Sequence, residues 1–128
     1  MKIGDFVEYC LSYPGSYEDL PFGEGWTAIR HKENKKLFAL IFNRDEHLCV
    51  NLKCDPERSD FLRQAFKEVK PGYHMNKEHW NTVILDEGLP EDDLHDMVRH
   101  SFELTRPKRK TKVNEDKPQF NTDSSSRP

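Results

Sequence analysis

The chain has 128 residues, of which 34% are charged and 34% are hydrophobic, and its formal net charge is -3 at pH 7. This length indicates one domain, and the eight Phe, four Tyr and two Trp residues can fill a modest core. No run of about 18 apolar residues is present, which argues against a membrane-spanning helix.

The cysteines and the N-terminus indicate a compartment. The three cysteines are an odd number without a Cys-x-x-Cys pair, which argues against a disulfide scaffold and against a four-cysteine zinc site. Asp5 lies where a signal peptide would need apolar residues. We therefore expect a reduced, cytoplasmic protein.

The charge is unevenly distributed along the chain. Residues 106–128 carry a net charge of +4, so residues 1–105 carry -7. An acidic body is unusual for a nucleic-acid binder, whose contact surface is normally a basic patch. Because charges act over a Debye length of about 8–10 Å, local patches matter more than this sum.

The first half of the chain predicts one helix and a three-stranded meander. Apolar residues at helical spacing predict a helix over residues 3–11. Tyr13-Pro14-Gly15 ends it, and a loop rich in turn formers follows. Strand-like runs at 26–30, 37–42 and 48–52 are separated by polar turns, which indicates two hairpins. The helix stripe consists of Ile3, Phe6, Val7, Cys10 and Leu11.

The second half predicts two helices around two short strands. Asp55-Pro56 is a strong helix start, because Asp caps the N-terminus and Pro fits the first helical position. Residues 70–75 indicate a turn entering a short strand, and residues 80–86 indicate another strand. A last helix over 90–104 has an acidic first turn that suits its dipole. The expected buried side of the middle helix is Phe61, Leu62, Ala65 and Phe66.

The element order α-β-β-β-α-β-β-α is typical of an α+β fold. We expect an antiparallel sheet of about five strands with the first and last helices on one face. We assign residues 1–106 to this domain. Residues 107–128 lack apolar periodicity and are expected to form a disordered polar tail. The residues expected to be largely buried beneath the helices are Ile3, Phe6, Val7, Leu11, Leu94, Val98 and Phe102.

Five ordered segments of the chain resemble the MmcQ/YjbR family. They read LSYPG and EDLPFG near the N-terminus, then VNLKCDP, PGYHMNK and HWNTV. The resemblance covers roughly residues 3–105. It implies a frataxin-like (CyaY-like) α+β fold and DNA binding through two hairpin-like wings.

Metal and enzyme motifs are weak. His95 and His100 are five residues apart on a helix, which turns them about 140° away from each other. His74 and His79 straddle a turn but have no patterned third ligand. The sequence contains no Gly-rich phosphate loop, His-Glu-x-x-His or Gly-x-Ser-x-Gly motif. We therefore expect no metal, no cofactor and no enzymatic activity.

Basic, amide and aromatic residues gather at the two predicted wings and on the strand between them. Lysines can contact phosphate, Asn can read or position a base edge, and Trp can stack on a base. The candidate contact residues are Lys35, Lys36, Asn51, Lys53, Lys70, His74, Asn76, Lys77, His79, Trp80 and Asn81.

The leading hypothesis is a small non-enzymatic DNA-binding protein that contacts phosphates through these wings. The acidic body predicts weak binding, micromolar at best for non-specific duplex. The alternative is a protein-interaction or small-ligand module that uses the open face of the sheet around Asn51, Lys53, His74 and Trp80. We expect a monomer that does not bind membranes.

Overall fold

The structure is a computed structural model that describes residues 2–21, 23 and 25–108. Three helices and six strands follow each other in the order α-β-β-β-β-α-β-β-α. The elements are α1 (Ile3–Leu11), β1 (Ser16–Asp19), β2 (Trp26–His31), β3 (Leu37–Arg44), β4 (His47–Lys53), α2 (Pro56–Ala65), β5 (Val69–Pro71), β6 (Trp80–Ile84) and α3 (Glu91–Thr105).

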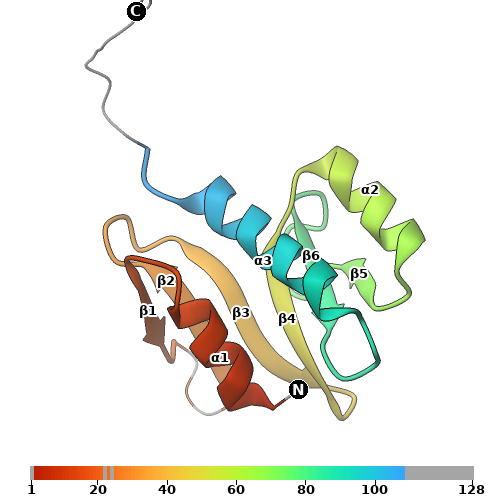
Figure 1. Cartoon of the computed structure of the whole chain (residues 1–128), viewed down its shortest axis with the longest axis horizontal. Coiled ribbons are helices and arrows are strands. Elements are labelled where there is room, and N and C mark those ends of the chain that lie inside the picture. Colours follow the sequence, from red (N-terminus) through yellow and green to blue (C-terminus); the bar gives the residue numbers. More distant parts are fainter. Residues whose placement is uncertain (1, 22, 24, 109–128) are drawn as a thin grey trace, which may run out of the picture.

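All six strands form one antiparallel sheet in the order β1-β2-β3-β4-β6-β5 (Figure 1). The predicted α+β class and the meander of β2, β3 and β4 are confirmed. The sheet has one strand more than the five expected, because residues 16–19 form β1 where we predicted a loop. β1 is an edge strand that pairs only with β2 and has no fully buried residue. Its sequence therefore lacks the apolar alternation that predicts a strand.

Helices α1 and α3 cover one face of the sheet (Figure 1), as predicted. Their buried side chains pack against alternate residues of the central strands, which point to the same face. Phe6 is 1% exposed and Val98 is fully buried. The main members of this core are Phe6, Cys10, Ile29, Ile41, Val50, Leu52, Val83, Leu94, Val98 and Phe102.

Several burial predictions for the first two helices are wrong. Ile3 is 44% exposed, since it is the first residue of α1 and extends past the sheet, and Val7 and Leu11 are only partly buried. Phe61 is 68% exposed. α2 lies beside the edge strand β5 rather than across the sheet (Figure 1), so Leu62 is its main contact with the core.

The α2 residues Ala65 and Phe66 also differ from the prediction. Ala65 is exposed and Phe66 is half-buried. The start of this helix is confirmed, because the Asp55 carboxylate accepts a hydrogen bond from the Glu57 N–H and Pro56 is the first helical residue. An N-cap signal is local, whereas the buried side of a helix depends on where the helix docks.

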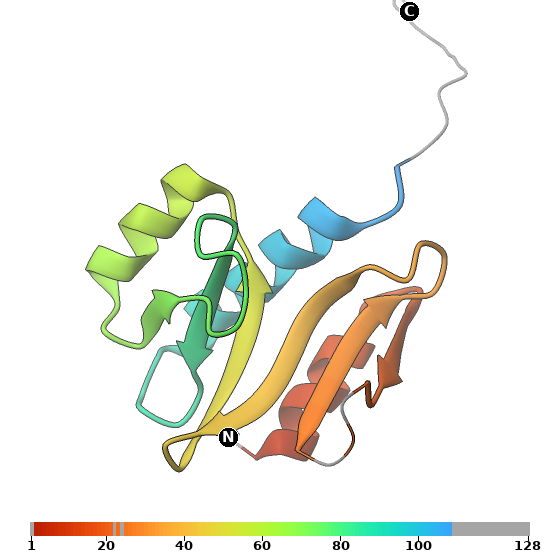
Figure 2. The ribbon, with the colours of Figure 1, turned by 180° about the vertical axis from the view of Figure 1, so that it is seen from behind.

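The opposite face of the sheet, which we call the non-helical face, is covered in part by residues 72–79 (Figure 2). These residues connect β5 to β6. Phe42 and Cys49 lie beneath this side, and the Tyr73 ring stacks on Phe42 with 5.6 Å between ring centroids. The strands β3 and β4 are therefore buried on both faces.

Two further predictions concern membrane spans and the C-terminal tail. Among the described residues, no helix is long and apolar enough to cross a membrane. Of the predicted tail at 107–128, residues 109–128 lie outside the described residues.

Candidate functional site

The strand register brings the two predicted wings to the same end of the sheet. We call residues 32–36, between β2 and β3, the turn wing, and residues 72–79, between β5 and β6, the loop wing. Lys53 at the end of β4 pairs with Trp80 at the start of β6. β3 also begins at this end, directly after the turn wing (Figure 2). Lys53 thus lies between the two wings.

The turn wing has a fixed backbone and exposed lysines. The Lys35 N–H donates to His31 O at 2.8 Å, and the His31 N–H donates to Lys36 O at 3.0 Å. The Asn34 amide reaches the end of α3, where its Nδ2 donates to Thr105 O at 3.0 Å. Lys35 and Lys36 are exposed. Their ammonium groups therefore project from a turn whose position is set by α3.

The loop wing is held by its own side chains and by α2. Asn76 Oδ1 accepts hydrogen bonds from the Glu78 and His79 N–H groups, at 2.9 and 3.2 Å. Arg63 of α2 donates from Nη2 to Lys77 O at 2.5 Å. Lys77 Nζ donates to Gly72 O at 2.8 Å. Asn76 and Lys77 are therefore exposed residues that also shape the loop.

The structure buries two of the candidate contact residues. Asn51 is fully buried, its Nδ2 donates to Tyr73 O at 2.9 Å, and its Oδ1 accepts from Thr82 Oγ1 at 2.5 Å. Asn81 is 2% exposed and accepts from Arg63 Nε at 2.8 Å. This corrects the expectation that the face around Asn51 is open. Asn51 holds the loop wing against the sheet, and Asn81 positions Arg63, which bonds to the loop wing at Lys77 O.

The remaining candidates lie at the surface. Trp80 and Lys53 are half-buried, and a Cβ on Gly72 would lie 2.8 Å from Trp80 Cβ, so the loop wing passes very close to the start of β6. His74 has a left-handed backbone with φ of 61° and its ring lies 4.0 Å from that of Tyr73. The exposed candidates are Lys35, Lys36, Lys70, His74, Asn76, Lys77 and His79.

A hollow of about 460 Å³ opens on the non-helical face between the β3–β4 turn and the loop wing. We call it the basic hollow and define it by Arg44, Lys70, Tyr73 and Lys77. The Arg44 guanidinium carbon lies 4.0 Å from the centre of the Tyr73 ring, a cation–π contact. The other lining residues are Asp45, His47, Cys49, Pro71, Thr82 and Ile84.

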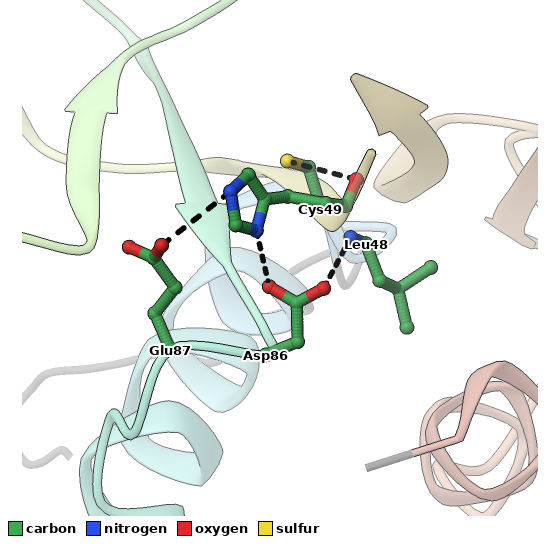
Figure 3. Close-up of polar contacts among 5 residues, drawn as sticks. Leu48, Cys49, Asp86 and Glu87 are labelled. Carbon is green, nitrogen blue, oxygen red and sulfur yellow. Dashed lines mark hydrogen bonds and ion pairs between the residues drawn. The ribbon is translucent and has the colours of Figure 1, made fainter. Parts of the chain in front are cut away.

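His47 is fixed at the rim of the basic hollow by two carboxylates (Figure 3). Its Nδ1 lies 2.9 Å from Asp86 Oδ1, and its Nε2 lies 3.4 Å from Glu87 Oε2. Asp86 Oδ2 accepts the Leu48 N–H at 3.0 Å, which is the main cause of its lowered pKa. The hydrogen bond to Asp86 raises the pKa of His47.

Cys49 lies beside this histidine but is not activated by it. Its thiol donates to the His47 carbonyl oxygen at 3.7 Å (Figure 3), and burial raises its pKa. A nucleophilic cysteine requires the opposite shift, toward the thiolate. Within residues 2–21, 23 and 25–108, no group of three or more His, Cys, Asp or Glu side chains is arranged to hold a metal ion. The cations that line the basic hollow are arranged where an anion could contact them.

Sequence reasoning missed Arg44, His47 and Tyr73 as members of this site. Arg44 and Tyr73 are far apart in the chain, and the pair His47–Asp86 is separated by 39 residues. Each contact joins segments that are distant in the sequence and come together only in the folded protein. No spacing in the sequence reports such a contact.

The fold and site together define a small α+β domain with helices on one face of a six-stranded antiparallel sheet and a basic hollow on the other. Comparison with protein families identifies it further. The chain belongs to the YjbR family, whose family model matches residues 11–104. This confirms the family resemblance found in the sequence.

Relatives and solved structures agree with that membership. The chain is 34% identical over 103 residues to the YjbR protein of Escherichia coli K12, covering 80% of this chain and 86% of that protein. It is 36% identical over 114 residues to the YyaQ protein of Bacillus subtilis, covering 80% and 96%.

Two solved structures have the same fold. The crystal structure of a Deinococcus radiodurans protein with a DUF419 domain matches with a TM-score of 0.71 and 36% identity, covering 80% of this chain and 77% of that one. A solution structure of a Pseudomonas syringae protein matches with a TM-score of 0.74 and 30% identity, covering 87% and 98%. The chain therefore shares its fold with these two proteins.

Proposed function

We propose that this protein is a small, non-enzymatic DNA-binding protein that contacts phosphates with its non-helical face and the adjoining end of the sheet. Its positioning charges are Lys35, Lys36, Lys53, Lys70 and Lys77, to which we add Arg44. In this proposal it acts as a cytoplasmic monomer without a metal or other cofactor. The frataxin-like arrangement implied by the family resemblance remains a prediction.

The observation that carries the proposal is the separation of charge between the two sides of the sheet. Helices α1 and α3 together contain seven acidic residues and one arginine. The basic hollow on the other side contains Arg44, Lys70 and Lys77. Because screening acts over about 8–10 Å, acids behind the sheet repel a bound strand only weakly. The net negative charge of residues 1–105 is therefore compatible with DNA binding on the non-helical face.

Acidic residues within the binding side limit the expected affinity. Glu78 lies in the loop wing, and Asp45 lies at the rim of the basic hollow. We therefore keep the expectation of micromolar affinity for non-specific DNA. The small-ligand alternative is supported by the hollow itself, since its volume is within the range of about 300–1,000 Å³ typical of ligand sites.

The test is a fluorescence-anisotropy titration of labelled duplex and single-stranded DNA at several salt concentrations. Counterion release should give a log–log slope of about −3 to −5 for three to five phosphate contacts. Lys53→Ala and Lys77→Ala should each make the slope shallower by about one. Lys67→Ala, in the exposed connection between α2 and β5, is the matched control and should leave the slope unchanged.

Two results would contradict DNA binding. One is a flat response to salt. The other is the absence of binding at about 50 mM salt with tens of micromolar protein, a condition under which electrostatic binding is strong. If Lys53→Ala and Lys67→Ala changed the salt-dependence slope equally, the proposed contact surface would be wrong even if the protein still bound DNA.

A further inference from the structure

We infer, on the basis of the proposed function, that the basic hollow binds a terminal phosphate monoester. The monoester has two possible sources, the phosphorylated end of a DNA strand or a free nucleoside monophosphate. In either case, the hollow recognises the end group, while the lysines of the turn wing contact internal phosphates.

The charge of the basic hollow suits a dianion. Arg44, Lys70 and Lys77 contribute three permanent positive charges, and Asp45 contributes one negative charge. The Asp45 side chain is 86% exposed, and its Oδ2 lies 3.7 Å from Arg44 Nε, so it points partly into solvent. Two further carboxylates, Asp86 and Glu87, pair with His47 at the rim. Among the lining residues, the Arg and Lys cations outnumber the single carboxylate by two. This excess favours a phosphate monoester, which carries about −1.5 to −2 at pH 7. An internal phosphodiester carries a single negative charge.

Arg44 of the basic hollow is held in position before any ligand arrives. Arg44 lies over the Tyr73 ring, which also stacks on the buried ring of Phe42. The Tyr73 backbone is fixed at both polar groups, because its N–H donates to Thr82 Oγ1 at 2.8 Å and its carbonyl accepts from Asn51. A planar guanidinium held in this way can donate two parallel hydrogen bonds to a phosphate.

The other two cations of the hollow are lysines from the loop wing and from β5. Lys77 Nζ donates one of its three N–H groups to Gly72 O at 2.8 Å, which leaves two for a ligand. Lys70 is exposed on β5 at the edge of the hollow. The preference for an end group follows from shape, since a strand end can enter a concave site while an internal phosphate is flanked by two nucleotides. Pro71 and Ile84 offer apolar surface to the terminal sugar.

The experiment compares one single-stranded oligonucleotide with a 5′-phosphate and with a 5′-hydroxyl, by competition against a labelled strand. Deoxyadenosine monophosphate and deoxyadenosine form the second matched pair, observed by chemical-shift changes in ¹H–¹⁵N spectra. The phosphorylated strand should bind about tenfold more tightly, because it gains at least one charge-assisted contact. The monophosphate, and not the nucleoside, should shift the resonances of Lys70 and Lys77.

Single-residue variants test whether the preference for the phosphorylated end arises in the basic hollow. Lys70→Ala removes an exposed side chain and should abolish the preference for the phosphorylated end without unfolding the domain. Arg44→Ala should do the same, with its thermal midpoint recorded because it also loses the contact with Tyr73. Lys36→Ala, in the turn wing, is the control and should weaken both strands equally while the preference persists.

The possible outcomes separate this inference from the proposed function. Salt-dependent binding with no difference between the two strand ends would overturn the inference and leave DNA binding intact. Binding of the monophosphate with no binding of either strand would support the hollow as a phosphate-monoester site and overturn the DNA proposal. Binding of neither class would overturn both.

Discussion

The turn wing and the loop wing lie at the same end of the sheet but are stabilised by different means. The turn wing is closed mainly by hydrogen bonds of its own backbone, with Asn34 as its main side-chain anchor to α3. The loop wing is held by side chains from three other elements: Asn51 of β4, Arg63 of α2 and Thr82 of β6. The comparison indicates that charge in the turn wing can be altered independently of the fold. In the loop wing, binding groups and structural groups are intermixed.

The largest expected effect comes from removing the aromatic support of the loop wing. Phe42 is fully buried and stacks on both Trp26 and Tyr73, with centroid distances of 4.9 and 5.6 Å. Phe42→Ala should lower the free energy of unfolding by about 3–5 kcal/mol, measured by urea denaturation. Phe61→Ala is the matched control, since Phe61 is 68% exposed and should cost little. Similar costs for both would contradict the assignment of Phe42 to a packed layer.

A smaller loss is expected from the amide that binds the loop wing to the sheet. Asn51→Ala leaves the part-buried Tyr73 carbonyl without its donor and the buried Thr82 hydroxyl without the acceptor of its proton. This should lower the free energy of unfolding by about 1–3 kcal/mol. Amide hydrogen exchange should also accelerate within residues 72–79. Unchanged exchange in this loop would show that Asn51 does not hold it.

The corresponding amide in the turn wing should matter less. Asn34→Ala removes the hydrogen bond to Thr105 O and the one that Asn34 Oδ1 accepts from the Lys36 N–H, at 2.9 Å. Both lie near solvent, so water can replace part of their energy, and we expect a loss of about 0.5–1.5 kcal/mol. The same denaturation series checks this. A loss larger than that of Asn51→Ala would reverse the comparison of the two wings.

The smallest effect concerns pH and has opposite signs at two histidines. Asp86 raises the pKa of His47, so the stability that this pair contributes is present below the ordinary histidine pKa of about 6.5 and is lost as pH rises through the higher folded value. Burial lowers the pKa of His31, which is 2% exposed and bonded to Thr105. Its contribution is present above about pH 6.5 and is lost as pH falls through the lower folded value.

Thermal midpoints of two variants test these signs. The cost of His47→Gln should be larger at about pH 5.5 than at about pH 8, and the cost of His31→Gln should show the reverse. The parent protein at each pH is the reference. If the cost of either substitution does not change with pH, that histidine is not coupled to folding through its proton.

The sequence predicted the elements whose signals are local. The meander, the Asp55-Pro56 helix start and the apolar stripe of α3 follow from alternation, capping and helical spacing, and each is present in the structure. The errors arise where tertiary position decides. Ile3 and Phe61 fit an apolar stripe but extend past the surface that their helices cover.

The candidate site was predicted only in part, for the same reason. Exposed lysines in polar turns are visible in a sequence, and Lys35, Lys36, Lys70 and Lys77 are exposed as expected. The sequence does not indicate whether an Asn side chain is exposed or buried. Asn51 acquires its partners Tyr73 and Thr82 only when the loop folds over the sheet. The basic hollow likewise exists only after β3, β5 and β6 have been brought together.

The short strand β5 has a consequence for how the molecules behave in concentrated solution. An unpaired strand edge can recruit a second chain by continuing the ladder of backbone hydrogen bonds. β5 has only three residues, and one of them is Pro71, which has no N–H to donate. At the opposite edge, β1 has four residues and includes Glu18 and Asp19. Both edges thus resist strand addition, which protects the protein against aggregation through edge-to-edge association.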